Sequence, residues 1–169
     1  MSLSRSFIAL IVVLVYACAP VAASTTFAKG IGDATGPLVA LGIAATYLGS
    51  GEHAKAKAAR VADAALIAVG TAAMLKPSLS VEEAGSGHTH TFPSGHTAIA
   101  FGTATAMADV FPKQKWLLYA GAALVGWSRV ESDAHTWRDV LGGAALGFGV
   151  GRWSVTSQDG LLLGRVYRF

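Results

Sequence analysis

The stretch THTFPSGHTAIAF, residues 89–101, joins a small polar cluster directly to an apolar run. Pro93 suits the end of a loop, and Ser94 is a favourable N-cap for a helix that begins after it. The apolar run shows no strand-like alternation and is rich in alanine, so it predicts a helix over residues 97–111. The polar cluster then lies at the start of that helix.

A helix start of this kind can bind an anion. The first turn carries free N–H groups and the positive end of the helix dipole, which attract phosphate. Gly95 has no side chain to block close approach, and His96 stands on the first turn beside any bound anion. The alternative is an ordinary N-cap followed by an exposed histidine.

The composition indicates a membrane protein. The chain has 169 residues, of which 53% are hydrophobic and 14% are charged, whereas a soluble domain carries about 25% charged residues. It contains 20 glycines, and small residues allow membrane helices to pack closely. The net charge of +3 comes without a dense basic run, so we expect no nucleic-acid partner. The single Cys18 cannot form an intrachain disulfide.

The N-terminus is typical of a secretory signal peptide over residues 1–23. Arg5 precedes an apolar stretch at residues 7–17, and small residues at 21–23 fit cleavage before Ser24. The alternative is an uncleaved first transmembrane helix. Both interpretations place Ser24 outside the cytoplasm.

Five further apolar segments predict an all-α fold. They are residues 36–49, 59–75, 97–111, 116–127 and 140–153. We expect a membrane-embedded bundle of five helices after the signal peptide, or six including it, in one domain over residues 24–153 with a C-terminal tail at 154–169. Several segments are shorter than the roughly 17–25 residues of a full span, so a soluble periplasmic bundle is the alternative.

The charges of the connections predict an orientation. If Ser24 is outside and the segments alternate, the inside connections and the tail carry more positive charges than the outside ones, as the positive-inside rule requires. The inside set is Lys55, Lys57, Arg60, Lys113, Lys115, Arg152, Arg165 and Arg168, and the outside set is Lys29, Lys76, Arg129 and Arg138. This orientation predicts a bacterial inner-membrane protein whose polar clusters, at Lys76 and at residues 93–96 and 128–139, all face the periplasm.

The outer connection SRVESDAHTWRD, residues 128–139, holds a second candidate cluster. His135 and Asp139 are four residues apart, which places both on one face of a helix. The carboxylate can accept one ring N–H and leave the other nitrogen free, as for a nucleophile or a base. Arg129 offers a fork of donors suited to phosphate oxygens. The alternative for the pair is a structural hydrogen bond.

Together these motifs resemble the type 2 phosphatidic acid phosphatase (PAP2) superfamily, which also contains bacterial class A acid phosphatases and vanadium haloperoxidases. The family motif PSGH is matched in full at residues 93–96. The family motif SRxxxxxHxxxD is matched in full by Ser128, Arg129, His135 and Asp139.

The family's first motif, KxxxxxxRP, is matched only at Lys76. Glu83 and Ala84 stand where the family has arginine and proline. We expect the Glu83 side chain to point away from the phosphate and another cation to replace the missing arginine. The candidates are Arg138, His88 and His90.

The resemblance implies a role for each matched residue. His135 would attack phosphorus, Asp139 would orient it, and His96 would protonate the leaving oxygen. The phosphoryl oxygens would be bound by Lys76, Ser94, Gly95 and Arg129. No metal or other cofactor is expected, although His88 and His90, with His135 and Asp133, offer an alternative metal site.

The predicted function is that of a metal-independent lipid phosphate phosphatase, a phosphomonoesterase or diphosphatase with a phosphohistidine intermediate. Its partners would be a lipid phosphate and the membrane. One alternative is a lipid phosphoryl transferase with the same intermediate. The other is a catalytically weak protein that binds lipid headgroups, which the missing arginine suggests.

The last predicted helix carries a repeat of small residues. Gly143, Gly147 and Gly151 recur every four residues, which predicts a face that packs closely on another helix.

Overall fold

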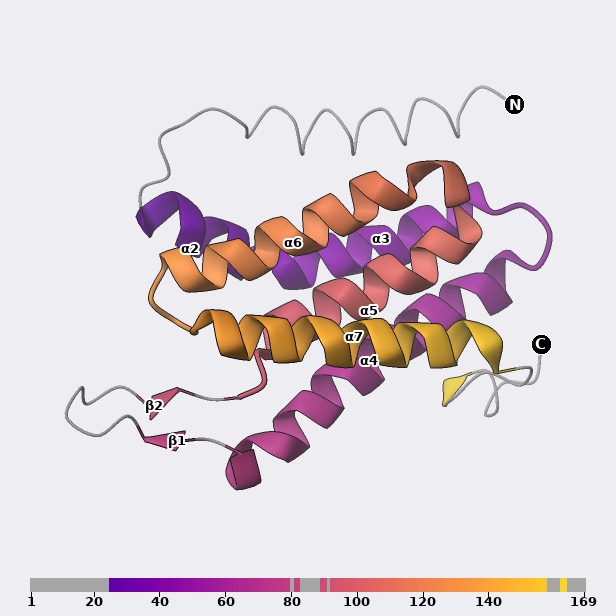
Figure 1. The fold of residues 1–169 in the computed structure, drawn as a ribbon. Helices are drawn as coiled ribbons and strands as arrows, with labels where there is room; N and C mark the ends of the chain where they lie inside the picture. The colour runs from indigo at the N-terminus through magenta and orange to yellow at the C-terminus, as the bar shows by residue number, and fades with distance from the viewer. Residues whose placement is uncertain (1–24, 80, 83–88, 91, 158–161, 164–169) are drawn as a thin grey trace.

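The computed structural model describes residues 25–79, 81–82, 89–90, 92–157 and 162–163. These residues are almost entirely helical (Figure 1). The helices are α2 (Thr25–Asp33), α3 (Thr35–Gly49), α4 (Ala54–Leu79), α5 (Gly95–Val110), the short 3₁₀ helix η1 (Pro112–Gln114), α6 (Lys115–Glu131) and α7 (Trp137–Thr156). The predicted signal segment lies outside the described residues.

The five apolar segments predicted after the signal segment correspond to helices α3 to α7. Helices α4, α6 and α7 extend past both ends of their apolar runs, whereas α3 and α5 begin before their runs but do not extend beyond them at the C-terminal end. The structure adds α2, which the sequence analysis did not predict. Its sequence, TTFAKGIGD, contains two glycines and two charged residues, and therefore has no continuous apolar run. A bend of 44° separates α2 from α3.

The connection between α4 and α5 contains a short strand pair that was also not predicted. Strand β1 (Val81–Glu82) pairs antiparallel with β2 (Thr89–His90). Val81 lies opposite His90, and Glu82 lies opposite Thr89. Each strand has only two residues, which is too few to show the alternation of apolar and polar residues from which a strand is predicted.

Helix α5 lies in the middle of the bundle and packs against α3, α4, α6 and α7 (Figure 1). Its buried face consists mainly of small side chains, with Met107 as the large exception. Ala98 and Ala106 are fully buried, and Ala68 and Ala72 of α4 are fully buried as well. These small residues let the neighbouring helices approach α5 closely.

The glycines of α7 form the predicted close-packing face, which lies against α5. A Cβ atom on Gly151 would lie 2.6 Å from the Cβ of Thr105. A Cβ atom on Gly143 would overlap the carbonyl oxygen of Ser94, and one on Gly147 would overlap that of Ala98. The backbones of α5 and α7 therefore lie in direct contact.

One end of the bundle gathers the polar motifs. In Figure 1 the C-terminal ends of α4 and α6 and the N-terminal ends of α5 and α7 lie at the left. The α3–α4 and α5–α6 connections lie at the opposite end. Lys76, the PSGH motif at residues 93–96 and the SRVESDAHTWRD connection thus share one end of the molecule.

Among the described residues, α4 is the helix that is long and apolar enough to cross a membrane. The bent pair α2 and α3 passes the same test when taken as one span. The shorter helices do not reach that length and composition, so membrane embedding of the bundle stays a prediction.

The C-terminal end of α7 and residues 162–163 of the tail pack onto α4, at the end of the bundle opposite to the polar motifs. The Ser154 hydroxyl donates to the carbonyl of Arg60 at 2.7 Å. The fully buried Asp63 carboxylate accepts the backbone N–H of Leu162 at 3.1 Å and of Leu163 at 2.8 Å. These bonds hold the described part of the tail against the bundle.

Candidate active site

The turn between α6 and α7 fixes the distance between Arg129 and His135. Asp133 adopts a left-handed conformation, with φ of 54°, which ends α6. The chain then folds back, so that the N–H groups of Ala134 and His135 both donate to the carbonyl of Arg129 at 3.0 Å. The six-residue spacing of the motif is the length that this turn requires.

The N-terminus of α7 fixes the Asp139 carboxylate. Thr136 is the N-cap and forms a capping box with Asp139. The Asp139 Oδ2 accepts the Thr136 N–H and the Thr136 hydroxyl, both at 2.9 Å, and the Thr136 Oγ1 accepts the Asp139 N–H at 3.4 Å. The carboxylate therefore has one defined orientation.

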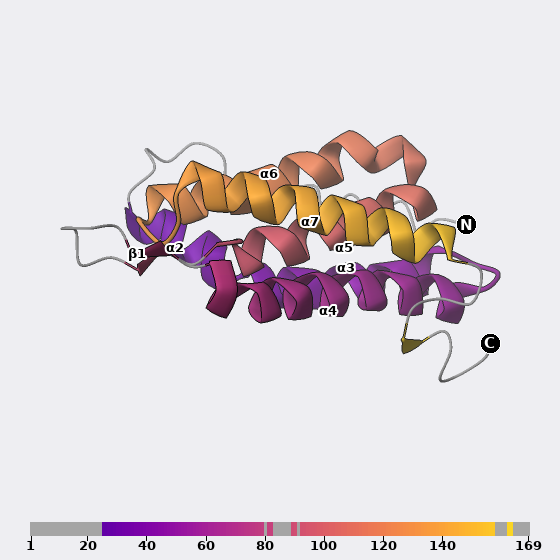
Figure 2. The same ribbon diagram turned by 60° about the horizontal axis from the view of Figure 1, so that its bottom comes forward.

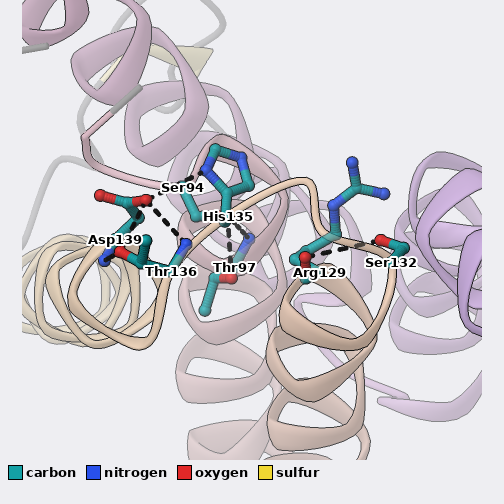
Figure 3. Close-up of polar contacts among 7 residues, drawn as sticks. All are labelled: Ser94, Thr97, Arg129, Ser132, His135, Thr136 and Asp139. Atoms are coloured by element: carbon teal, nitrogen blue, oxygen red, sulfur yellow. Dashed lines mark hydrogen bonds and ion pairs between the residues drawn. The ribbon is translucent and has the colours of Figure 1, made fainter. Parts of the chain in front are cut away.

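His135 and Asp139 are neighbours for a different reason from the one predicted. They do not share a helix face, because His135 precedes the first residue of α7. The capping box instead turns the carboxylate back toward the ring, and Oδ2 lies 3.7 Å from His135 Nδ1 (Figure 3). This distance is longer than a hydrogen bond, but it places the negative charge beside Nδ1.

The N-terminus of α5 lies beneath the His135 ring in Figure 3. Ser94 is the N-cap, as predicted: its Oγ accepts the Thr97 N–H at 3.5 Å and the Thr97 hydroxyl at 3.0 Å. The Ser94 N–H donates to the carbonyl of Asp139 at 3.0 Å. This last bond ties the start of α5 to the first turn of α7.

The Arg129 guanidinium and the His135 ring project to the same side, beyond the helix ends (Figure 3). Both are poor in partners: the buried Arg129 Nε and His135 Nδ1 have no hydrogen-bond partner among the described residues. Buried donors without partners are rare and often indicate a missing ligand or ion. The guanidinium and the α5 N-terminus both favour an anion.

Lys76 and His96 complete the cluster. A Cβ atom on Gly95 would lie 3.9 Å from the Lys76 Nζ, so the lysine reaches the start of α5. His96 is exposed on the first turn of α5, within electrostatic range of Arg129, Lys76 and Asp33.

The electrostatics keep His135 neutral. Burial, together with the positive charges of Arg129 and Lys76, lowers the pKa of the imidazole to about 4, against the opposing effect of Asp139. A neutral ring has one nitrogen with a free lone pair, as a nucleophile requires. The ring nitrogen that does not face Asp139 is Nε2.

The structure brings together all seven predicted site residues, from the ends of four helices. They are Lys76, Ser94, Gly95, His96, Arg129, His135 and Asp139. Thr136 was not predicted from the sequence, although its position three residues before an aspartate is an N-capping signal.

The cation that replaces the missing first-motif arginine stays a prediction. Glu83 and His88 lie outside the described residues, and of His90 only the backbone is described. Arg138 is exposed, and its Cζ lies 5.6 Å from the centre of the Phe92 ring. Within the described ranges, no group of three or more histidine, cysteine, aspartate or glutamate residues could hold a metal ion.

Comparison with known families identifies the superfamily of the chain. The sequence profile of the PAP2 superfamily matches residues 9–161, which is most of the chain. The chain belongs to the PAP2 superfamily. The matched range includes the PSGH and SRxxxxxHxxxD motifs.

Two individual relatives of this PAP2 chain are informative. A lipid A 1-phosphatase of Porphyromonas gingivalis is 41% identical over 74 residues, which cover 41% of this chain and 17% of the relative. The crystal structure of Aquifex aeolicus LpxE superposes with a TM-score of 0.60 at 21% identity, covering 82% of this chain and 89% of LpxE. The second comparison confirms a PAP2-like helical fold.

Proposed function

We propose that this PAP2 protein is a metal-independent lipid phosphate phosphatase with a phosphohistidine intermediate. The observation that carries the proposal is the arrangement around His135. The ring is neutral, Asp139 faces its Nδ1 at 3.7 Å, and the Arg129 guanidinium projects to the same side.

In the first step of the proposed reaction, His135 Nε2 attacks phosphorus. An N–P bond forms, and the bond between phosphorus and the lipid oxygen breaks. His96 donates its proton to the leaving oxygen. The imidazole gains positive charge as it bonds to phosphorus, and the nearby Asp139 carboxylate stabilises that charge.

In the second step a water molecule attacks the phosphorus. His96, now neutral, accepts a proton from the water, the N–P bond breaks, and inorganic phosphate leaves. Throughout both steps, the phosphoryl oxygens are bound by Arg129, Lys76, the Ser94 hydroxyl and the Gly95 N–H. These donors act on the charge that spreads over the equatorial oxygens in the transition state.

Two observations support a lipid as the substrate. One relative is named as a lipid A 1-phosphatase. Large apolar side chains are also exposed along the helices, where a lipid chain could lie against them. They include Leu38, Leu41, Leu48, Leu66, Met74, Leu141 and Phe148.

We place the catalytic domain, residues 24–153, in a bacterial inner membrane with the active site at the periplasmic face. The excess of lysine and arginine in the opposite connections supports this orientation. Exposed tryptophans near both ends of the bundle support the membrane location, because tryptophan is enriched at both membrane interfaces. They are Trp137 at the active-site end, and Trp116 and Trp153 at the other.

The test is phosphate release from a panel of lipid phosphates in detergent with EDTA present, with phosphatidate, undecaprenyl diphosphate and lipid A in the panel. We expect the wild-type protein to release phosphate and the His135→Asn variant to release none. The matched control is His53→Asn, an exposed histidine in the α3–α4 connection at the opposite end.

Rapid acid or alkaline quenching with labelled substrate identifies the intermediate. We expect labelled phosphate on His135 that is retained after alkaline quenching and lost after acid quenching. Phosphate trapped on Ser94 would overturn the assigned roles, and a wild-type protein inactive on the whole panel would overturn the proposed function.

A further inference from the structure

Helix α2 has no role in the mechanism above, but it is anchored beside the site. It packs against α6, near the α6 C-terminus that carries Arg129 (Figure 2). Ala28 is fully buried, and Ile31 packs on a core cluster that includes Ala100 and Val125. The backbone of α2 is therefore held in place by α5 and α6.

Gly32 is the point where α2 meets the Arg129 side chain. A Cβ atom on Gly32 would overlap the guanidinium Nη1 and would lie 3.2 Å from Cζ. Gly30 is in the same helix, and a Cβ atom there would meet nothing within 4 Å. The close approach is thus a property of position 32 and not of α2 as a whole.

The guanidinium is the partner that would have to move. A methyl group on Gly32 would meet the far end of a flexible side chain, whereas the α2 backbone is fixed by Ala28 and Ile31. Arg129 also ends close to the C-terminus of α2, where the helix dipole is negative and favours a cation. Helix α2 thus limits the positions that the guanidinium can take.

We propose that Gly32 is a positioning residue: its missing side chain lets α2 pack against the Arg129 guanidinium and hold it toward the phosphoryl group. The proposal rests on the proposed function in one respect, because it takes Arg129 to bind phosphoryl oxygens. It adds α2, which carries none of the family motifs, to the parts of the chain that determine the rate.

The test compares Gly32→Ala with Gly30→Ala in the full chain. Both variants add one methyl group to α2 and raise its helix propensity equally. We expect Gly30→Ala to keep kcat/KM for the lipid phosphate and the Kd for orthovanadate, a phosphate analogue, within about twofold of wild type. We expect Gly32→Ala to fold with a melting temperature no lower than that of wild type, but to lose at least about tenfold in kcat/KM and in orthovanadate affinity, as displacement of one charged donor requires.

A double-mutant cycle separates positioning from general packing. In an Arg129→Ala background, Gly32→Ala should cause no further loss, because the guanidinium that it displaces is absent. An equal loss in both backgrounds would overturn the proposal, as would equal kinetics of Gly32→Ala and Gly30→Ala. If Gly32→Ala alone fails to fold, the Gly32→Ala/Arg129→Ala protein decides: folding of the double variant supports the contact, and its failure overturns the proposal.

The two proposals can fail separately. A wild-type protein that turns over lipid phosphate but shows no difference between the two glycine variants retains the function and loses the inference. If the wild-type protein is inactive on lipids, but binds orthovanadate with an affinity that Gly32→Ala lowers and Gly30→Ala does not, the proposed function is lost and the inference about Gly32 is retained. A wild-type protein that neither turns over lipid phosphate nor binds orthovanadate overturns both.

Discussion

At His135 the backbone and the side chain have different partners. The backbone N–H is held by the carbonyl of Arg129, and the ring faces Asp139 and the open end of the bundle. The position of the ring is thus set by the turn, while its charge state is set by burial and by the neighbouring charges. These two properties can be tested by different substitutions.

The pH dependence tests the charge state. Because the folded protein holds the His135 pKa at about 4, the ring should stay neutral as the pH falls from 7 to about 5. We expect the acid limb of kcat/KM, after correction for substrate ionisation, to lie near pH 4. Removing the positive charge in Arg129→Gln should raise the pKa and move the limb to higher pH, whereas Arg152→Gln at the far end should not. An acid limb near pH 6.5 in the wild type would contradict this assignment.

The left-handed residue tests the position of the ring. Asp133 has φ of 54°, which glycine and asparagine tolerate and β-branched residues do not. Asp133→Gly and Asp133→Asn should therefore keep both stability and turnover. Asp133→Val should lose about 1–2 kcal/mol of unfolding free energy and should lower kcat/KM, because the bonds to the Arg129 carbonyl loosen. Denaturation in detergent and initial rates measure the two effects, and equal behaviour of the valine and glycine variants would show that the turn is not under this constraint.

The site was predictable where the signal is local. Ser94 precedes an apolar run, and an N-cap depends only on the neighbouring backbone, so its place could be inferred. The contact between His135 and Asp139 was also expected, but with the wrong geometry. A spacing of four residues gives the same pattern whether the helix begins before the histidine or, as here, after it.

Among the elements, α7 depends most on the absence of side chains. Its contact with α5 is made through glycines, and the first of them, Gly143, lies against the N-cap residue of α5. The packing of these two helices therefore also determines how the start of α5 lies beside Asp139.

Two glycines of α7 provide a matched pair of substitutions. Gly147→Ala places a Cβ atom against the carbonyl of Ala98, whereas a Cβ atom on Gly149 meets nothing within 4 Å. We expect Gly147→Ala to cost roughly 1–3 kcal/mol through overpacking, and Gly149→Ala to be neutral or stabilising by up to about 1 kcal/mol. Thermal unfolding measures the difference, and coincident transitions would contradict the close contact.

Helix α2 shows where prediction from the sequence stops. The apolar runs and the glycine repeat predicted α3 to α7, because each has its own periodicity or length. Helix α2 is short, contains Lys29 and Asp33, and is stabilised by contacts with the distant α6. No local pattern reports such a contact, and for the same reason Gly32 could not be recognised as a neighbour of Arg129.

For the whole molecule, the separation of the two ends is the main feature. One end carries the site residues, and the other carries the lysine-rich connections and the anchored Leu162 and Leu163. The bundle between them exposes apolar side chains. This polarity is what an enzyme needs if it works at one face of a membrane.

Reporter fusions test that orientation. A reporter fused after Lys57 or Lys115 should be cytoplasmic, and one inserted at Gly87 should be periplasmic, because positively charged connections stay inside. The protein should also remain in the membrane pellet after carbonate extraction. Release of the whole mature chain by carbonate would instead support a soluble periplasmic bundle.

The carbonyl of Arg129, which accepts two N–H groups at once, has a consequence for how such an enzyme can diverge. Enzymes commonly acquire new substrates by lengthening or shortening the loops around the site. An insertion between Arg129 and His135 would break both bonds and turn the His135 ring away from the Arg129 guanidinium. We therefore expect the α6–α7 turn to keep a constant length among related enzymes. New substrate specificity would then arise from changes in the other elements that border the site.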